Sequence, residues 1–75
     1  MNERHFVVME GERGEGGHVL GVFSDEAAAR ELYTRQRKQL EERWHKVYPE
    51  RPPGQMGCDW VSLVRWEGEK SEWLP

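Results

Sequence analysis

Three histidines and one cysteine are among the side chains of this chain that could hold a metal ion or form a nucleophile–base pair. They are His5, His18, His45 and Cys58. Zinc needs three or four ligands that converge on one point. His5 and His18 fall at opposite ends of a predicted hairpin, and His45 lies on a predicted helix. Cys58 with Asp59 matches no recognised ligand spacing. The sequence therefore predicts no metal site, no cofactor and no catalytic residues.

The glycine-rich run at residues 11–17 could be read as a phosphate-binding loop. It reads GERGEGG, with four glycines in seven residues. A phosphate-binding loop leads from a strand into a helix N-terminus and often carries a lysine. This run instead joins two apolar segments and contains Glu12, Arg13 and Glu15. It predicts a hairpin turn, in which glycine supplies positive φ at low cost.

A basic segment at residues 30–46 is the strongest polar candidate. Its six cationic side chains are Arg30, Arg35, Arg37, Lys38, Arg43 and Lys46. A cationic ridge of this kind could contact phosphates, and Arg35, Arg37 and Lys38 would make that contact. Glutamates in the same segment form (i, i+4) pairs with these bases, as in Glu31–Arg35. An ion-paired, solvated helix face is therefore favoured, and nucleic-acid contact is the alternative.

Tryptophan is the strongest apolar candidate, with four in 75 residues. Trp60 and Trp66 lie on the same face of one predicted strand, about 20 Å apart, so one helix cannot easily cover both. Tryptophan is also enriched among residues that dominate protein–protein binding. The sequence predicts a partner-binding surface anchored by Trp60, Val64, Trp66 and Trp73. The alternative is that one tryptophan is core and the chain's tail covers the others.

Three short apolar runs predict strands near residues 5–10, 18–23 and 59–67. A strand with one face in water alternates apolar and polar residues, and these runs do not. Both faces of the sheet would therefore be apolar, while the chain offers one helix to cover them. One face is expected to need a partner, a second copy or a folded-back tail.

The first two strands have a predicted register in which Glu10 pairs with His18. Strict alternation then places one apolar set on the first face: Phe6, Val8, Leu20 and Val22. It places a second set on the other face: Val7, Met9, Val19, Gly21 and Phe23.

One long helix is predicted near residues 25–47. Ser24 or Asp25 can cap its free N–H groups, and alanines follow. Leu32 and Leu40 lie on or beside its apolar stripe, so we expect them to pack against one hairpin face. Proline and glycine residues after position 48 end the helix.

The element order β-β-α-β predicts a single α+β domain over residues 1–75. We expect a three-stranded antiparallel sheet of order 2-1-3 with the helix on one face. Residues 68–75 read as a turn and a frayed C-terminal tail. The lone cysteine, the charged N-terminus and the lack of a long apolar run predict a cytoplasmic protein without a membrane anchor. A formal net charge of −3 argues against a generic nucleic-acid binder.

The junction at residues 21–29, GVFSDEAAA, resembles one in small uncharacterised bacterial and phage proteins. These share a hairpin, a G-V-[FY]-S-x-x-x-x-A step, one helix and a final strand. The resemblance implies this fold and no reaction. In size and charge the chain is also similar to small phage proteins that bind and redirect host enzymes such as RNA polymerase.

These observations favour a non-catalytic protein-binding module, a regulator or inhibitor of a larger assembly such as the transcription machinery. Nucleic-acid contact through the basic segment is one alternative. A structural homodimer that joins through the sheet face is the other. An enzyme is not expected, because no acid, base and nucleophile set can be assembled.

Overall fold

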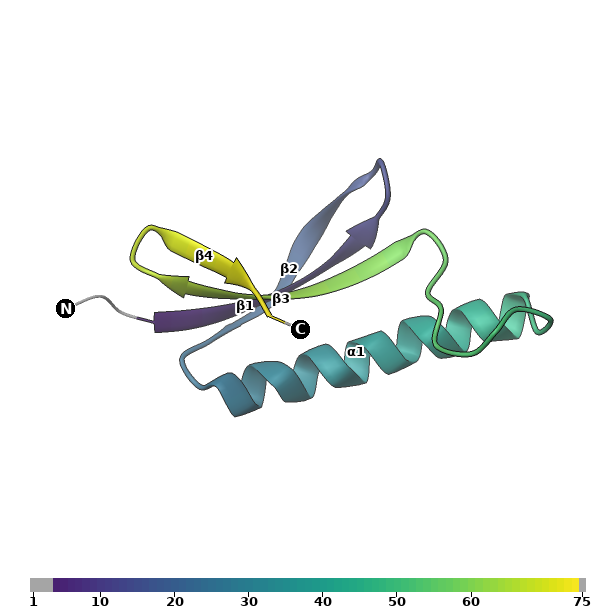
Figure 1. Cartoon of the computed structure of the whole chain (residues 1–75), viewed down its shortest axis with the longest axis horizontal. Coiled ribbons are helices and arrows are strands. Elements are labelled where there is room, and N and C mark those ends of the chain that lie inside the picture. Colours follow the sequence, from purple (N-terminus) through teal and green to yellow (C-terminus); the bar gives the residue numbers. More distant parts are fainter. Residues whose placement is uncertain (1–3, 75) are drawn as a thin grey trace.

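The computed structural model describes residues 4–74, which form an antiparallel sheet with one helix on one side (Figure 1). The elements in chain order are β1 (Arg4–Glu12), β2 (Gly16–Phe23), α1 (Glu26–Val47), β3 (Asp59–Glu67) and β4 (Lys70–Trp73). The sheet order is β2-β1-β3-β4, and each neighbouring pair is antiparallel. The α+β class and the β-β-α-β start of the chain are as predicted. No helix within residues 4–74 is long and apolar enough to cross a membrane.

The prediction of three strands is wrong, because β4 adds a fourth beside β3. Gly68 adopts a φ of 60° in the connecting turn. Trp73 then pairs with Val64, and the Leu74 N–H donates to the Leu63 carbonyl at 2.8 Å. The order 2-1-3 is thus extended to 2-1-3-4 by residues whose sequence predicts a turn and a frayed tail. The segment KSEW carries no strand signal because it has no apolar run, and its strand conformation depends on pairing with β3.

The hairpin of β1 and β2 contains a bulge that corrects the predicted faces. Glu10 pairs with His18 as expected, but the register shifts between Val8 and Met9, so Val8 pairs with Gly21. Leu20 is the extra residue of the bulge. Every position beyond it changes face, because the side-chain period of a strand is two. Gly21 and Phe23 therefore join the helix side, and Val22 moves to the opposite side.

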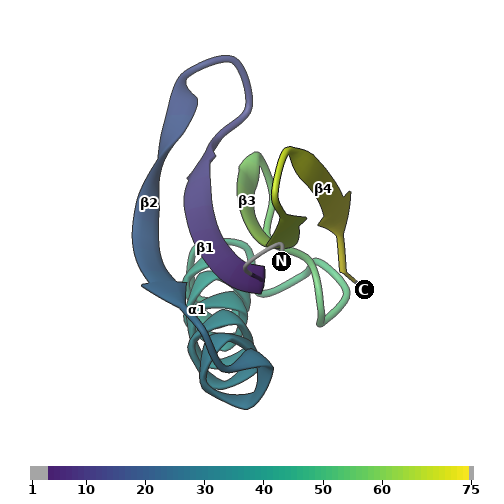
Figure 2. The ribbon, with the colours of Figure 1, turned by 90° about the vertical axis from the view of Figure 1, so that its left-hand side faces the viewer.

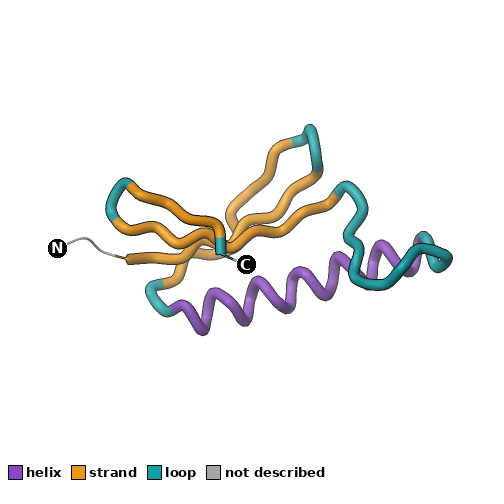
Figure 3. The backbone as a smooth tube through the Cα atoms, viewed as in Figure 1, coloured by secondary structure: helices purple, strands orange, loops and turns teal. Residues whose placement is uncertain are grey.

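The helix α1 begins and ends close to the predicted bounds. The Asp25 carboxylate accepts a hydrogen bond from the Ala27 N–H at 3.1 Å, so Asp25 is the N-cap rather than Ser24. The Tyr48 N–H donates to the Trp44 carbonyl at 2.9 Å and closes the last turn. The loop at residues 48–58 then returns the chain to the sheet (Figure 3).

The core lies between α1 and one face of the sheet (Figure 2). Its buried members are Phe6, Val8, Ala29, Leu40, Val61 and Leu63. Leu20, Phe23 and Leu32 pack against this cluster and are partly buried. The predicted packing of Leu32 and Leu40 on a hairpin face is confirmed. Figure 2 shows no element on the far side of the sheet among the described residues.

Candidate interaction surface

A row of apolar residues crosses all four strands on the side of the sheet away from α1. Val7 pairs with Val22 on one side and with Val64 on the other, and Val64 pairs with Trp73. Residues that pair across an antiparallel ladder project from the same face. Val64 is 7 % exposed but does not belong to the core cluster beneath the helix. We call Val22, Val7, Val64 and Trp73 the valine–tryptophan row.

Three shorter rows flank the valine–tryptophan row on the same face. They are His5–Trp66–Ser71 on one side, then Val19–Met9–Ser62 and Gly17–Gly11–Trp60 on the other. The His5 and Trp66 rings stack with centroids 6.4 Å apart and planes 7° from parallel. The four rows together are called the open face.

The open face carries no Asp, Glu, Lys or Arg side chain. By the same register, the charged residues of the strands project from the helix side: Arg4, Glu10, Glu12, Asp59, Arg65, Glu67, Lys70 and Glu72. Several pair with one another there, as in the Arg4–Glu67 ion pair at 2.7 Å and the Arg65–Glu72 pair. Antiparallel sheets with one solvated face normally place polar residues on it. This sheet does the opposite, which indicates that its open face is suited to burial.

Exposure on the open face is greatest at the two edges of the sheet. Trp73 on β4 is 71 % exposed, and Val22 and Val19 on β2 are 61 % and 51 % exposed. Ser62 and Val64 on the central strand β3 are buried. Large apolar side chains are thus exposed to solvent at both edges of one uncharged surface. Single exposed apolar residues are common on proteins and need no functional explanation, but a group on one surface does.

The hairpin glycines have two roles, of which the sequence predicted only the turn. Gly14 and Gly16 adopt φ values of 83° and 76°. Gly11 and Gly17 instead make room for Trp60, since a Cβ at either position would lie 2.6–2.7 Å from its indole ring. Trp60 therefore lies across the hairpin and is partly buried by it.

The four residues predicted to bind a partner all lie on the open face, although they differ in exposure. Trp73 is exposed, Trp60 and Trp66 are partly buried, and Val64 is buried. Neither Val19 nor Val22 was predicted to bind a partner; strict alternation places Val19 on the correct face and Val22 on the wrong one. Gly21 was the available signal, since a glycine inside a strand often marks a bulge.

The basic helix residues are only partly engaged by acids. Arg37 Nε donates to Glu41 at 3.0 Å, which is an (i, i+4) pair, and Arg37 also donates to the Tyr33 hydroxyl at 3.1 Å. The hydrogen bond with Glu41, and then that with Tyr33, raise the pKa of the Arg37 guanidinium. Arg35 and Lys38 are exposed. The three residues predicted for nucleic-acid contact thus lie on a helix surface of mixed charge.

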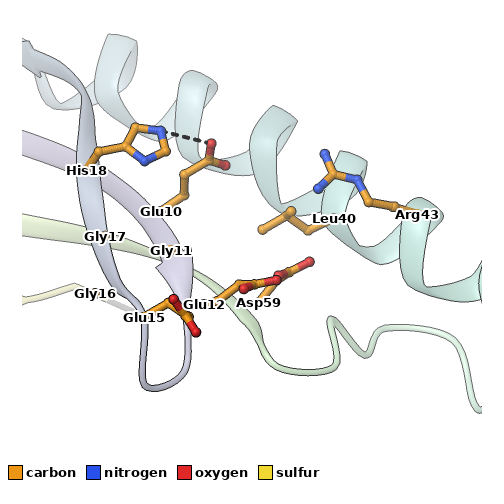
Figure 4. A pocket seen from close by; sticks show the side chains of 10 residues that line it. All are labelled: Glu10, Gly11, Glu12, Glu15, Gly16, Gly17, His18, Leu40, Arg43 and Asp59. Carbon is orange, nitrogen blue, oxygen red and sulfur yellow. Dashed lines mark ion pairs between the residues drawn. The ribbon is translucent and has the colours of Figure 1, made fainter.

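An acidic hollow of about 370 Å³ lies between the hairpin and the C-terminal half of α1 (Figure 4). Glu10 accepts from Gln36 Nε2 at 2.5 Å and pairs with His18 at 3.2 Å. Arg43 extends from the helix beside Leu40. Small-molecule sites are mostly apolar with a few polar groups, whereas charged side chains and glycine backbone dominate this lining. The hollow is therefore a weaker candidate than the open face.

One group of possible metal ligands was not anticipated from the sequence. Glu12 and Asp59 pair across β1 and β3, and the loop places Cys58 beside them. The ligand atoms of these three residues lie within 4.8 Å of one another, with Glu12 and Cys58 exposed. The arrangement offers two carboxylates and a thiol at a solvated end of the sheet, where acidic groups commonly gather without an ion.

Trp44, the remaining tryptophan, lies on the helix and not on the open face. Its ring packs beside Tyr48 at a centroid distance of 4.4 Å. A Cβ at Gly57 would lie 2.2 Å from the Trp44 ring, so the returning loop passes close over it. Trp44 therefore serves to hold the loop against the helix.

Comparison with protein-family models, curated proteins and solved structures gives no match. The geometry and composition of the open face are therefore the basis on which a function is inferred.

Proposed function

We propose that the protein is a non-catalytic binding module that uses the open face to join a protein partner. The observation that carries the proposal is the uncharged surface across four strands, from which Val22 and Trp73 project at opposite edges. Large apolar side chains that are exposed together on one uncharged surface mark an interaction site more often than single exposed residues do. A module of this kind acts by occupancy, so its role is to regulate or inhibit the assembly that it joins.

The dimensions of the open face suit a small protein interface. Three strand spacings and three two-residue steps along the strands give a face of about 14 Å by 20 Å between Cα atoms. Projecting side chains extend this to on the order of 400–500 Å², against roughly 800 Å² for each partner in a standard interface. A partner that covered the whole face would thus form a contact below the standard size, as in weak or transient association.

The chemistry of the open face favours a protein over the other macromolecules. Phosphate recognition by nucleic-acid binders depends on Lys and Arg, which this face lacks. Peripheral membrane surfaces combine an apolar patch with basic residues at its rim. The strand bases Arg4 and Arg65 instead project from the helix side and are paired there with Glu67 and Glu72.

A pair of matched substitutions tests the proposal. Val22 on the open face and Val47 at the end of α1 are 61 % and 62 % exposed. Val22→Lys and Val47→Lys make the same chemical change at equal exposure, and lysine is tolerated on edge strands and at helix C-termini. The tagged wild type and both variants would be used for affinity capture from a lysate of the source organism, after circular dichroism has confirmed that each is folded.

We expect Val47→Lys to retain the same proteins as the wild type and Val22→Lys to lose them, because burying an unpaired charge is costly. Equal retention by the two variants would show that the open face is not the binding surface. Retention of the same proteins by Val22→Lys together with their loss in Val47→Lys would place the site at the helix end.

A further inference from the structure

We propose that the occupant of the open face in the isolated protein is the open face of a second copy. The inference rests on the proposed function, since it names the partner of that same surface. It concerns a face-to-face dimer of two sheets related by a two-fold axis, the commonest symmetry of homo-oligomers.

The charge distribution leaves the open face as the surface through which two copies can meet. The chain has a formal net charge of −3, so two copies repel each other over most of their surfaces. The open face is the exception, because the acids and bases of the strands project from the helix side. Two open faces can therefore meet without placing like charges directly opposite each other, which would otherwise disfavour association.

The shape of the valine–tryptophan row makes the face self-complementary. Its ends are a large projecting residue, Trp73, and a small one, Val22. A two-fold axis parallel to the strands and midway between β1 and β3 reverses the order of the row in the second copy. Trp73 of each copy then lies over Val22 of the other. At the centre Val7 lies over Val64, which is only 7 % exposed in the single chain, so the edge pairs supply most of the new contact. This axis also keeps the strands of the two sheets nearly aligned, a common geometry for packed sheets.

The size of the face predicts a dimer that exchanges with monomer. Two faces of on the order of 400–500 Å² bury roughly 900 Å² in total, below the range of standard stable interfaces. Association should therefore depend on concentration over the accessible range, and another protein with an apolar surface could compete for the same face.

Sedimentation equilibrium tests the association itself. The wild type would be measured from about 1 µM to about 1 mM, a range that covers weak association. We expect the mass to rise from 8.9 kDa towards twice that value. Val47→Lys should follow the wild type, and Val22→Lys should remain monomeric throughout. A dimer that persists in Val22→Lys would overturn the inference.

Chemical crosslinking tests the arrangement. Single-cysteine variants, Val22→Cys and Trp73→Cys, would be made in a Cys58→Ser background. They would be treated with a bis-maleimide that spans about 10 Å, the distance between packed sheets. The proposed axis brings position 22 of one copy to position 73 of the other. In a dimer of the two variants one of these contacts holds both cysteines, and the symmetry-related contact keeps its native Val22 and Trp73. We expect a crosslinked dimer only when the two variants are mixed.

The remaining outcomes separate a failure of the dimer from a failure of the proposed function. Crosslinking of Val22→Cys with itself would show that the β2 edges pair and would overturn the face-to-face arrangement. A wild type that stays monomeric at every concentration, but captures another protein through Val22, would overturn the inference and leave the proposed function standing. A monomer that captures nothing through Val22 would overturn both.

Discussion

Truncation of Trp73 to alanine should separate folding from binding more clearly than any other single change. Trp73 ends the chain's last strand, and 71 % of it is exposed. A tryptophan offers about 200 Å² for burial, so about 60 Å² of Trp73 is covered by its own chain and about 140 Å² is free. At about 25 cal/mol per Å², the covered part stabilises the fold by about 1.5 kcal/mol. Covering the free part would contribute at most about 3.5 kcal/mol to association.

Trp73→Ala should therefore lower the free energy of unfolding by about 1–2 kcal/mol, a surface-like cost. Association through the open face should weaken by at least about 2 kcal/mol, or about 30-fold in Kd. Urea unfolding at a few micromolar, followed by circular dichroism, measures the first quantity. Sedimentation equilibrium measures the second.

Two comparison variants define the scale of the Trp73 result. Leu63→Ala removes a residue that is 1 % exposed and should cost about 2–5 kcal/mol in unfolding free energy. Tyr48→Ala removes an exposed aromatic away from the open face and should leave association unchanged. If Trp73→Ala destabilised the fold as much as Leu63→Ala, or left association unchanged, the assignment of Trp73 to a binding surface would be refuted.

Three further predictions concern the core, the hairpin and the helix. Leu40→Ala should lower the free energy of unfolding by about 2–5 kcal/mol in urea melts, because Leu40 is 3 % exposed in the core. A loss below about 0.5 kcal/mol would contradict the placement of Leu40 in the core. Gly17→Ala should cost about 1–3 kcal/mol in the same assay, since its Cβ would meet the Glu10 carbonyl and the Trp60 ring at 2.6 Å; an unchanged midpoint would show that Trp60 does not lie there. Given the net charge of −3, the protein should not bind double-stranded DNA or RNA in fluorescence anisotropy at about 50 mM salt. Binding that weakens with salt and is lost in an Arg35→Glu, Lys38→Glu double variant would instead establish the helix as a phosphate-contact surface.

Local chemistry in the sequence was enough to predict most of the elements. The acidic cap and alanine run locate the helix start, and prolines after Tyr48 locate its end. The glycine run between two apolar segments predicts the hairpin. Continuous apolar character in the strands predicts that both faces of the sheet need cover. These signals act within a few residues, so tertiary contacts did not overturn them.

The bulge and the fourth strand required the tertiary structure. Leu20 is an extra residue only in relation to β1, and strict alternation along β2 cannot reveal the shift that it causes. The β4 segment has polar residues at three of its four positions, and its pairing depends on the free edge of β3. Such non-local pairing is absent from any short window of sequence.

The sequence by itself determined that the chain makes one capped helix and apolar strands with more surface to bury than that helix can cover. Only the tertiary structure decided which residues share the uncovered face. The helix packs on the face that carries Phe6, Val8 and Leu63, and the bulge moves Val22 to the opposite face. Pairing of β3 with β4 then adds Trp73 to that face. The physical reason is that side-chain direction in a sheet depends on cross-strand register, which contacts between distant residues establish.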